Sequence, residues 1–228
     1  MIYAIADLHL DHTGEKCMSV FGKSWYDYEN KIFTNWNELV KADDTVLVPG
    51  DISWGLKLED AYSDLLRIEN LPGKKIILKG NHDYWWQSLK KLRNLGFETI
   101  EFLQNNSYYV EKYNIIGARG WVSRDNPEFT VEDEVVFKRE LIRLKLSLDS
   151  IKKDGEIIAM LHYPPFSKDK KPNEFAGILE EYGVKTCLYG HLHSEGLSGV
   201  VEGNIKGIEY KCISSDYLNF KPILIRGD

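Results

Sequence analysis

Apolar runs and amphipathic stretches alternate along the first half of the chain. The runs have the length and the continuous apolar character of strands buried in a sheet. They are residues 1–6, 45–49 and 75–78. Other stretches repeat apolar residues at three- and four-residue steps, which is typical of helices packed on one face. They are residues 28–42, 58–71 and 85–95. This order predicts a parallel sheet with helical crossover connections.

From residue 98 the pattern changes, and short strand-like runs at first follow one another without helices. The strands predicted there are residues 99–102, 108–111, 114–117, 156–161 and 185–189. Helices are predicted over residues 131–152 and 175–182. The buried face of the longer helix is predicted to be Phe137, Leu141, Leu144, Leu148 and Ile151. Residues 196–226 read as strand and turn, so we expect two packed sheets with outer helices.

Residues 13–27 have no clear period and contain two glycines among scattered aromatic residues. We expect this stretch to form a flap over a functional site. The whole chain, residues 1–228, is long enough for one sizeable core and is expected to form one domain.

Charge and cysteine content narrow the class of protein. A formal net charge of -6 gives no bulk attraction to nucleic acid or to an anionic membrane, so a nucleic-acid partner is open but not favoured. The cysteines, Cys17, Cys187 and Cys212, are widely spaced and predict neither a disulfide framework nor a cysteine zinc site. No apolar stretch approaches about 20 residues and no signal-like segment opens the chain, so we expect a cytoplasmic protein without a membrane anchor.

Five predicted strands end in polar residues. Those residues are Asp7 and His9, Asp51, Asn81 with His82 and Asp83, His162, and His191 with His193. Five of the six histidines lie at these ends, and His12 is the exception. The carboxyl ends of strands are where ligand crevices form in open α/β sheets. Seven of these side chains form a set of oxygen and nitrogen donors without a thiolate, which suits two borderline or hard divalent ions. The seven are Asp7, His9, Asp51, Asn81, His162, His191 and His193.

The motifs Asp-x-His, Gly-Asp, Gly-Asn-His-Asp, His and Gly-His-x-His occur in this order from Asp7 to His193. In this respect the chain resembles the calcineurin-like metallophosphoesterases. The resemblance implies their fold, a four-layer α-β-β-α sandwich. It also implies a first metal site of Asp7, His9 and His193, a second of Asn81, His162 and His191, and Asp51 bridging the two. His82 would be the catalytic histidine beside the bridging Asp51.

The resemblance implies a phosphohydrolase that cleaves a small phosphomonoester or phosphodiester by attack of a metal-bridging hydroxide. A pair of cations would polarise the phosphoryl oxygens and lower the pKa of the shared water. Manganese, or a mixed iron and manganese centre, is expected on family grounds, and zinc stays open. The alternatives are a nuclease or nucleotide pyrophosphatase on the same site, and a catalytically silent protein-interaction scaffold. The oligomeric state is not predicted.

Three further residues are candidates for substrate contact. Arg119 follows a predicted strand and could clamp a phosphate, and a surface salt bridge is the alternative. Trp54 could line the pocket and stack on a base or sugar, with core packing as the alternative. His12 extends the first motif and could touch the substrate, or it could be only a surface residue.

Overall fold

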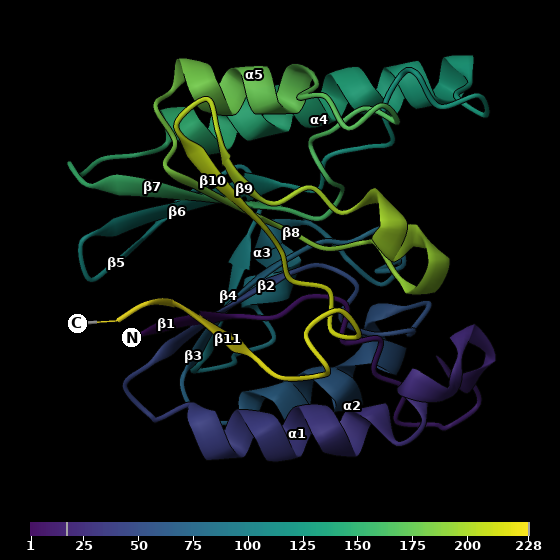
Figure 1. Ribbon diagram of the computed structural model, residues 1–228. Coiled ribbons are helices and arrows are strands. Elements are labelled where there is room, and N and C mark those ends of the chain that lie inside the picture. Colours follow the sequence, from purple (N-terminus) through teal and green to yellow (C-terminus); the bar gives the residue numbers. More distant parts are fainter. Residues whose placement is uncertain (17, 228) are drawn as a thin grey trace.

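Two β-sheets lie face to face in the structure, a computed structural model that describes residues 1–16 and 18–227, and helices cover both outer faces (Figure 1). The covering helices are α1 (Tyr28–Leu39) and α2 (Leu58–Glu69) on the first sheet and α4 (Val131–Asp149) and α5 (Glu174–Glu181) on the second. The predicted α/β sandwich of two sheets between helical layers is confirmed.

The first sheet contains the strands of the first half and one strand from the end of the chain. Its spatial order is β11 (Ile223–Arg226), β1 (Ile2–Ala4), β2 (Thr45–Pro49), β3 (Lys74–Leu78) and β4 (Ile100–Leu103). Strands β1 to β3 are parallel, as predicted, and β4 continues the parallel order, whereas β11 is antiparallel to β1. The carboxyl ends of four neighbouring strands therefore lie along one edge.

The second sheet also has a parallel centre. Its spatial order is β5 (Tyr108–Val110), β6 (Tyr113–Ala118), β7 (Glu156–Leu161), β8 (Thr186–Tyr189), β10 (Ile208–Cys212) and β9 (Gly203–Ile205). Strands β6, β7, β8 and β10 are parallel, and the outer strands β5 and β9 are antiparallel to their neighbours. Both sheets can thus present strand ends to one site.

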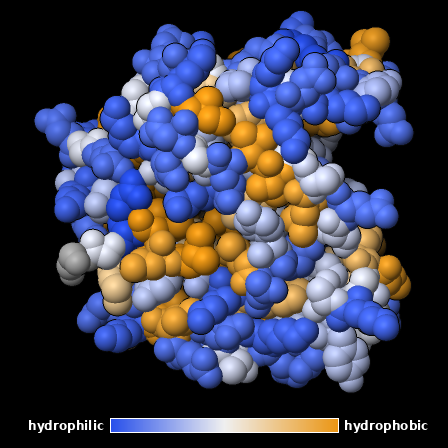
Figure 2. Space-filling view, viewed as in Figure 1, coloured by the Kyte–Doolittle hydropathy of each residue, from blue (hydrophilic) through white to orange (hydrophobic). Residues whose placement is uncertain are grey.

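Apolar side chains form three clusters that hold the four layers together. Trp36 and Leu65 belong to the cluster between the first sheet and its helices. Phe137 belongs to the cluster under α4 and α5, and Leu47 and Met160 lie between the two sheets. The outer faces of the helical layers are largely hydrophilic, and apolar side chains reach the surface mainly between those layers (Figure 2). This pattern follows from helices that bury only one face.

The helix predicted over residues 85–95 is wrong in extent, because α3 spans only Leu89–Arg93. The indoles of Trp85 and Trp86, just before α3, form side-chain hydrogen bonds instead of packing as part of a helix. Trp85 Nε1 donates to the carboxylate of Asp83, and Trp86 Nε1 donates to Gln104 Oε1. Both rings are buried. A local bond to Asp83 and a tertiary bond to Gln104 therefore override helical periodicity before Leu89.

The long predicted helix begins as expected and ends three residues early, at Asp149. Thr130 caps it, since its hydroxyl accepts from the Asp133 N–H and the Asp133 carboxylate accepts from the Thr130 N–H. Of the predicted buried face, Leu141 and Ile151 are only partly buried. Glu140 is buried instead, which the apolar pattern did not predict.

Two stretches without clear periodicity form short 3₁₀ helices. In the predicted flap these are η1 (Met18–Phe21) and η2 (Lys23–Trp25). A third, η3 (Ser194–Gly199), replaces part of the predicted strand-and-turn tail. The Ser194 hydroxyl donates to the Phe21 carbonyl, so η3 and the predicted flap are in contact. Cys17 lies outside the described residues, and Cys187 and Cys212 are buried free thiols.

Candidate metal centre

The polar residues at the strand ends lie in tight turns. Asp7, His9, Asp51 and His191 all have positive φ, between 46° and 71°, a region that side chains rarely adopt. Glycines allow the chain segments to approach them. A Cβ on Gly80 would overlap the Asp51 carboxylate, so the glycine before Asn81 is required by the close approach of two loops.

Asp7, His9 and His193 form one group of converging donors. Their ligand atoms all lie within 4.8 Å of one another. The two Nε2 atoms of His9 and His193 are 3.4 Å apart, and His193 Nε2 is 3.5 Å from Asp7 Oδ1. A loop after β1 and a loop after β8 therefore bring two imidazoles and a carboxylate to one point.

Asn81, His162 and His191 form a second group. Asn81 Oδ1 lies 2.6 Å from His162 Nε2 and 2.9 Å from His191 Nδ1. These three side chains follow β3, β7 and β8, so both sheets contribute. They could hold a second ion through two nitrogens and an amide oxygen.

Asp51 lies between the two groups. Its Oδ2 is 3.7 Å from His9 Nε2 and 3.4 Å from His162 Nε2. Its Oδ1 accepts a hydrogen bond from the His82 backbone N–H at 2.8 Å, which orients the carboxylate. One carboxylate oxygen thus faces a donor of each group.

Two of the imidazoles are oriented by acceptors outside the groups. His162 Nδ1 donates to the Pro49 carbonyl at 3.1 Å, because a carbonyl can only accept, and this leaves Nε2 with its lone pair facing the site. His193 Nδ1 lies 2.8 Å from Asp216 Oδ1. Such bonds are typical of metal-ligating histidines, since they fix both ring orientation and tautomer.

Burial sets the protonation of the imidazoles. It lowers the pKa of His162 to about 4 and of His191 to about 3, and it holds the pKa of His9 well below its usual value. These rings are neutral at pH 7 and can act as ligands. Burial also opposes protonation of His193, but Asp7 and Asp216 outweigh it and raise the pKa of His193 to about 10.

The carboxylates are the costly part of the site. Burial, with Asp83 and Asp7 close by, raises the pKa of Asp51 well above its usual value. Asp83 is satisfied by backbone N–H groups of Gly80 and Ile52 and by the Trp85 indole. Asp51 has one such donor in the part of the chain that the structure describes. Buried carboxylates facing imidazoles fit divalent cations, and the absence of thiolate among the donors favours hard or borderline ions.

His82 lies beside the donor groups without belonging to them. Its ring centroid is 4.5 Å from that of Trp54 and 5.7 Å from that of His9. The ring is half-buried, and this burial lowers the pKa of His82. Trp54 also stacks on His9 at 4.9 Å, so its ring supports two site histidines.

The structure places the other two substrate candidates beside buried carboxylates. Arg119 Nη2 is 3.3 Å from Oε1 of the buried Glu140, and its guanidinium stacks 4.3 Å from the Trp121 ring centroid. His12 Nδ1 lies 3.6 Å from Asp64 Oδ2. Within the described chain, no ring contact or hydrogen bond joins His12 to the two donor groups. Contact of either residue with substrate stays a prediction.

A cavity of about 320 Å³ opens beside His191. Trp121, Tyr163 and Phe166 supply its aromatic surface, and the Tyr163 ring lies 4.0 Å from the His191 ring. A cleft of this kind next to a polar centre is the usual place for the organic part of a substrate.

Sequence reasoning missed two residues that shape the centre. Asp216 holds His193, but it lies in a Ser-Ser-Asp segment with no recognisable motif. Trp25 is buried with its ring 5.3 Å from His193 and 5.9 Å from His9. Its position in the aromatic-rich stretch of residues 13–27 was the only signal, and it places part of the predicted flap against the first donor group.

Comparison with known proteins gives one family and several relatives. The model of the calcineurin-like phosphoesterase family matches residues 1–195. An uncharacterized protein of Methanocaldococcus jannaschii, MJ1445, is 23% identical over 156 residues, which are 66% of this chain and 84% of that protein.

Two solved structures share the fold. The protein of unknown function AQ665 from Aquifex aeolicus is 20% identical, with a TM-score of 0.50 over 98% of this chain and 94% of its own. The phosphopantetheinyl hydrolase of Mycobacterium tuberculosis is 12% identical, with a TM-score of 0.60 over 99% of this chain and 96% of its own. Among the described residues, no helix has the length and apolarity needed to span a membrane.

Proposed function

The chain belongs to the calcineurin-like phosphoesterase family and is a metal-dependent phosphoesterase, and from this premise we propose that it hydrolyses a small phosphomonoester or phosphodiester with two divalent ions. The position of Asp51, with one oxygen facing a donor of each group, is the observation that carries the proposal. A shared carboxylate is what a two-ion centre requires.

The two donor groups divide the ligands. Asp7, His9 and His193 would hold the first ion and Asn81, His162 and His191 the second. Asp51 would bridge them. When bound, the ions would act as Lewis acids that polarise the phosphoryl oxygens and make a water nucleophilic near neutral pH.

His82 would act on the substrate. Its ring lies near His9, a member of the first donor group, and it forms no ion pair with an Asp or Glu among the described residues. It could donate a hydrogen bond to a phosphoryl oxygen or a proton to the leaving oxygen. Trp54 would hold the ring in place through their contact.

The remaining features of the proposal follow from the same residues. Mixed oxygen and nitrogen ligands support manganese or an iron and manganese pair, and they accept zinc as well. The partner would be a small phosphorylated molecule. Buried free thiols at Cys187 and Cys212 support a reducing compartment such as the cytoplasm.

Reconstitution tests the proposal. Protein stripped of metal and then loaded with Mn²⁺ should hydrolyse bis(p-nitrophenyl) phosphate or p-nitrophenyl phosphate, and the stripped protein should not. The two rates would decide between diester and monoester preference. Two bound ions without turnover of either ester, or of any phosphoester in a substrate panel, would contradict the proposed function and favour the scaffold alternative.

A further inference from the structure

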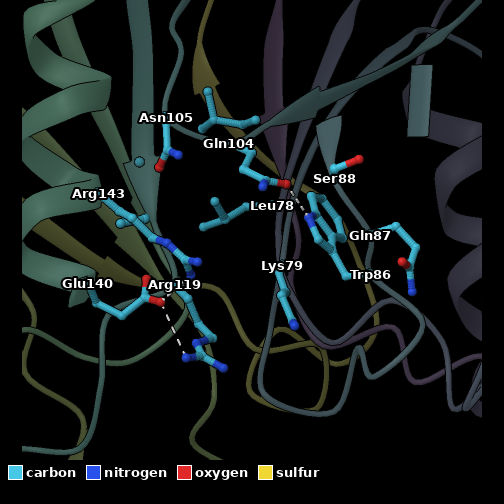
Figure 3. A pocket seen from close by; sticks show the side chains of 13 residues that line it. Leu78, Lys79, Trp86, Gln87, Ser88, Gln104, Asn105, Arg119, Glu140 and Arg143 are labelled. Atoms are coloured by element: carbon cyan, nitrogen blue, oxygen red, sulfur yellow. Dashed lines mark hydrogen bonds and ion pairs between the residues drawn. The ribbon is translucent and has the colours of Figure 1, made fainter. Parts of the chain in front are cut away.

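A second polar cavity, of about 310 Å³, lies where β3, β4 and β6 end beneath α4 (Figure 3). We call it the basic cavity, because Lys79, Arg119 and Arg143 line it together with Glu140. Figure 3 shows Lys79 and Arg119 on opposite sides of the cavity, with their charged ends directed to the same edge. Its volume is at the lower end of the range for small-ligand pockets.

The basic cavity is directly beside the candidate metal centre. Lys79 precedes Asn81 by two residues, a chain distance of at most about 7 Å. The Arg119 carbonyl accepts a hydrogen bond from the His162 backbone N–H at 3.1 Å. Adjoining backbone segments therefore carry the two sites, and a substrate that occupies both has to bridge only a short distance.

The charges in the basic cavity do not cancel. Three cations face one carboxylate, that of Glu140, which is 1% exposed. Arg143 and Arg119 both approach the same oxygen of Glu140, at 2.7 Å and 3.3 Å. The Lys79 ammonium has no ion pair or hydrogen bond with any described residue. A local excess of positive charge in a chain of net charge -6 indicates an anionic ligand.

Two buried polar atoms in this cluster also lack partners. Glu140 Oε2 and Arg119 Nε are both buried, and neither makes a hydrogen bond within the described chain. Buried polar atoms are almost always paired, so each such atom needs a specific explanation. Glu140 Oε2 can only accept, and Arg119 Nε can only donate. A ligand that both accepts and donates would satisfy the pair.

We propose that the basic cavity binds a second phosphate group of the substrate, within about 10 Å of the phosphoester cleaved at the metal centre. A phosphate monoester has a second pKa near 6 and is partly protonated near neutral pH. Its oxygens would accept from Lys79, Arg119 and Arg143, and its hydroxyl would donate to Glu140 Oε2. This assignment rests on the proposed function and adds the substrate class, namely bisphosphorylated small molecules.

Two esters that differ only in the second phosphate test the assignment. The Mn²⁺-loaded protein should release inorganic phosphate from 1,4-butanediol bisphosphate with a kcat/KM at least about ten-fold above that for 1,4-butanediol monophosphate, after a statistical factor of two. Ten-fold is the change that a single charge-assisted hydrogen bond readily supplies. Equal values for the two esters would overturn the proposal, and so would an equal preference for 4-phosphooxybutanoate, whose second anion is a carboxylate.

Substitutions connect the preference to the basic cavity. Arg143→Gln keeps a donor for Glu140 but removes the charge, and it should return the ratio of the two kcat/KM values to near the statistical factor. Lys79→Gln serves as a second variant, since the Lys79 ammonium has no hydrogen-bond or ion-pair partner among the described residues to lose. Arg139→Gln on the exposed side of α4 and Lys74→Gln at the start of β3 are the matched controls, and both should keep the preference. A preference kept in both cavity variants would overturn the proposal.

Binding without turnover separates this proposal from the proposed function. Calorimetric titration should give a Kd for butane-1,4-bisphosphonate at least about ten-fold below that for butylphosphonate, and Lys79→Gln should abolish the difference. Tighter binding of the bisphosphonate without hydrolysis of any ester would refute the proposed function and support the basic cavity. Hydrolysis of both esters without any preference would do the opposite.

Discussion

Charged side chains are buried at both ends of the first sheet, but the two ends differ in the hydrogen-bond partners that the chain supplies to them. At the amino end of β3, the ammonium of Lys75 donates to the carbonyls of Glu69 and Leu71 and to the Thr99 hydroxyl. At the carboxyl end, Asp51 faces other carboxylates and imidazoles, and within residues 1–16 and 18–227 its carboxylate accepts from one backbone N–H.

This difference in partners suggests that the amino end serves stability and the carboxyl end serves function. At the amino end the chain itself supplies acceptors for the buried ammonium, so that end needs no ligand. The carboxyl end leaves charge to be neutralised from outside, at a cost to the stability of the metal-free protein. Substitutions at the two ends should therefore change different measurable properties.

The largest effect is expected for Asp51→Asn. Asparagine tolerates the left-handed backbone and can still accept from the His82 N–H, but it cannot bridge two cations. We expect kcat/KM to fall at least about 1,000-fold with loss of bound metal. The Tm of the metal-free variant should rise by about 2 to 4 °C, because a buried like charge is removed. A lower Tm would mean that the buried Asp51 carboxylate does not destabilise the metal-free protein.

His82→Ala should act on turnover alone. We expect kcat to fall about 100- to 1,000-fold, the usual contribution of a positioned acid or hydrogen-bond donor. Metal content measured by elemental analysis should stay at the wild-type level, because the ring belongs to neither donor group. If His82→Ala lost as much metal as Asp51→Asn, the assignment of His82 as a catalytic residue that is not a metal ligand would be wrong.

The pH dependence of stability should reveal Lys75. Burial lowers the pKa of Lys75 to about 8 in the folded protein, against about 10.5 when unfolded, so the unfolded chain binds the extra proton between these values. The free energy of unfolding of the wild type, relative to Lys75→Met, should therefore rise by up to about 3 kcal/mol from pH 8 to 10.5. Urea unfolding of both proteins at several pH values measures this difference. A difference that does not change with pH would show that Lys75 does not titrate in this range.

A smaller effect is expected for Thr99→Val at the same end. The Thr99 hydroxyl bonds to the Glu69 carboxylate at 2.7 Å and to Lys75 at 2.9 Å. Its loss should lower the free energy of unfolding by about 1 to 2 kcal/mol with kcat/KM unchanged within two-fold. Thr34→Val, at an exposed position of α1, is the matched control. A loss of activity in Thr99→Val would show that the two ends are coupled.

The sequence predicted most of the fold and the donor residues because both follow local rules. Apolar runs that end in Asp, Asn or His mark a strand and its carboxyl end at once, so Asp51 and His162 could be placed from the pattern alone. Their roles as metal ligands remain predictions. Asp216 and the burial of Glu140 depend on contacts between distant segments, which no local period records. Trp86, in the predicted 85–95 helix, was misassigned for the same reason, because its indole bonds to Gln104 on a later loop.

The position of β1 affects how the protein is made. This strand, from the first residues of the chain, lies between β2 and β11, and the carbonyl of Asp7 accepts from the hydroxyl of Ser215. A ribosome adds about 5 to 20 residues per second, so β1 waits on the order of ten seconds or more for its last neighbour. During synthesis the strand has an open edge that chaperones can bind. We expect metal to enter only after residues 215–226 have left the ribosome.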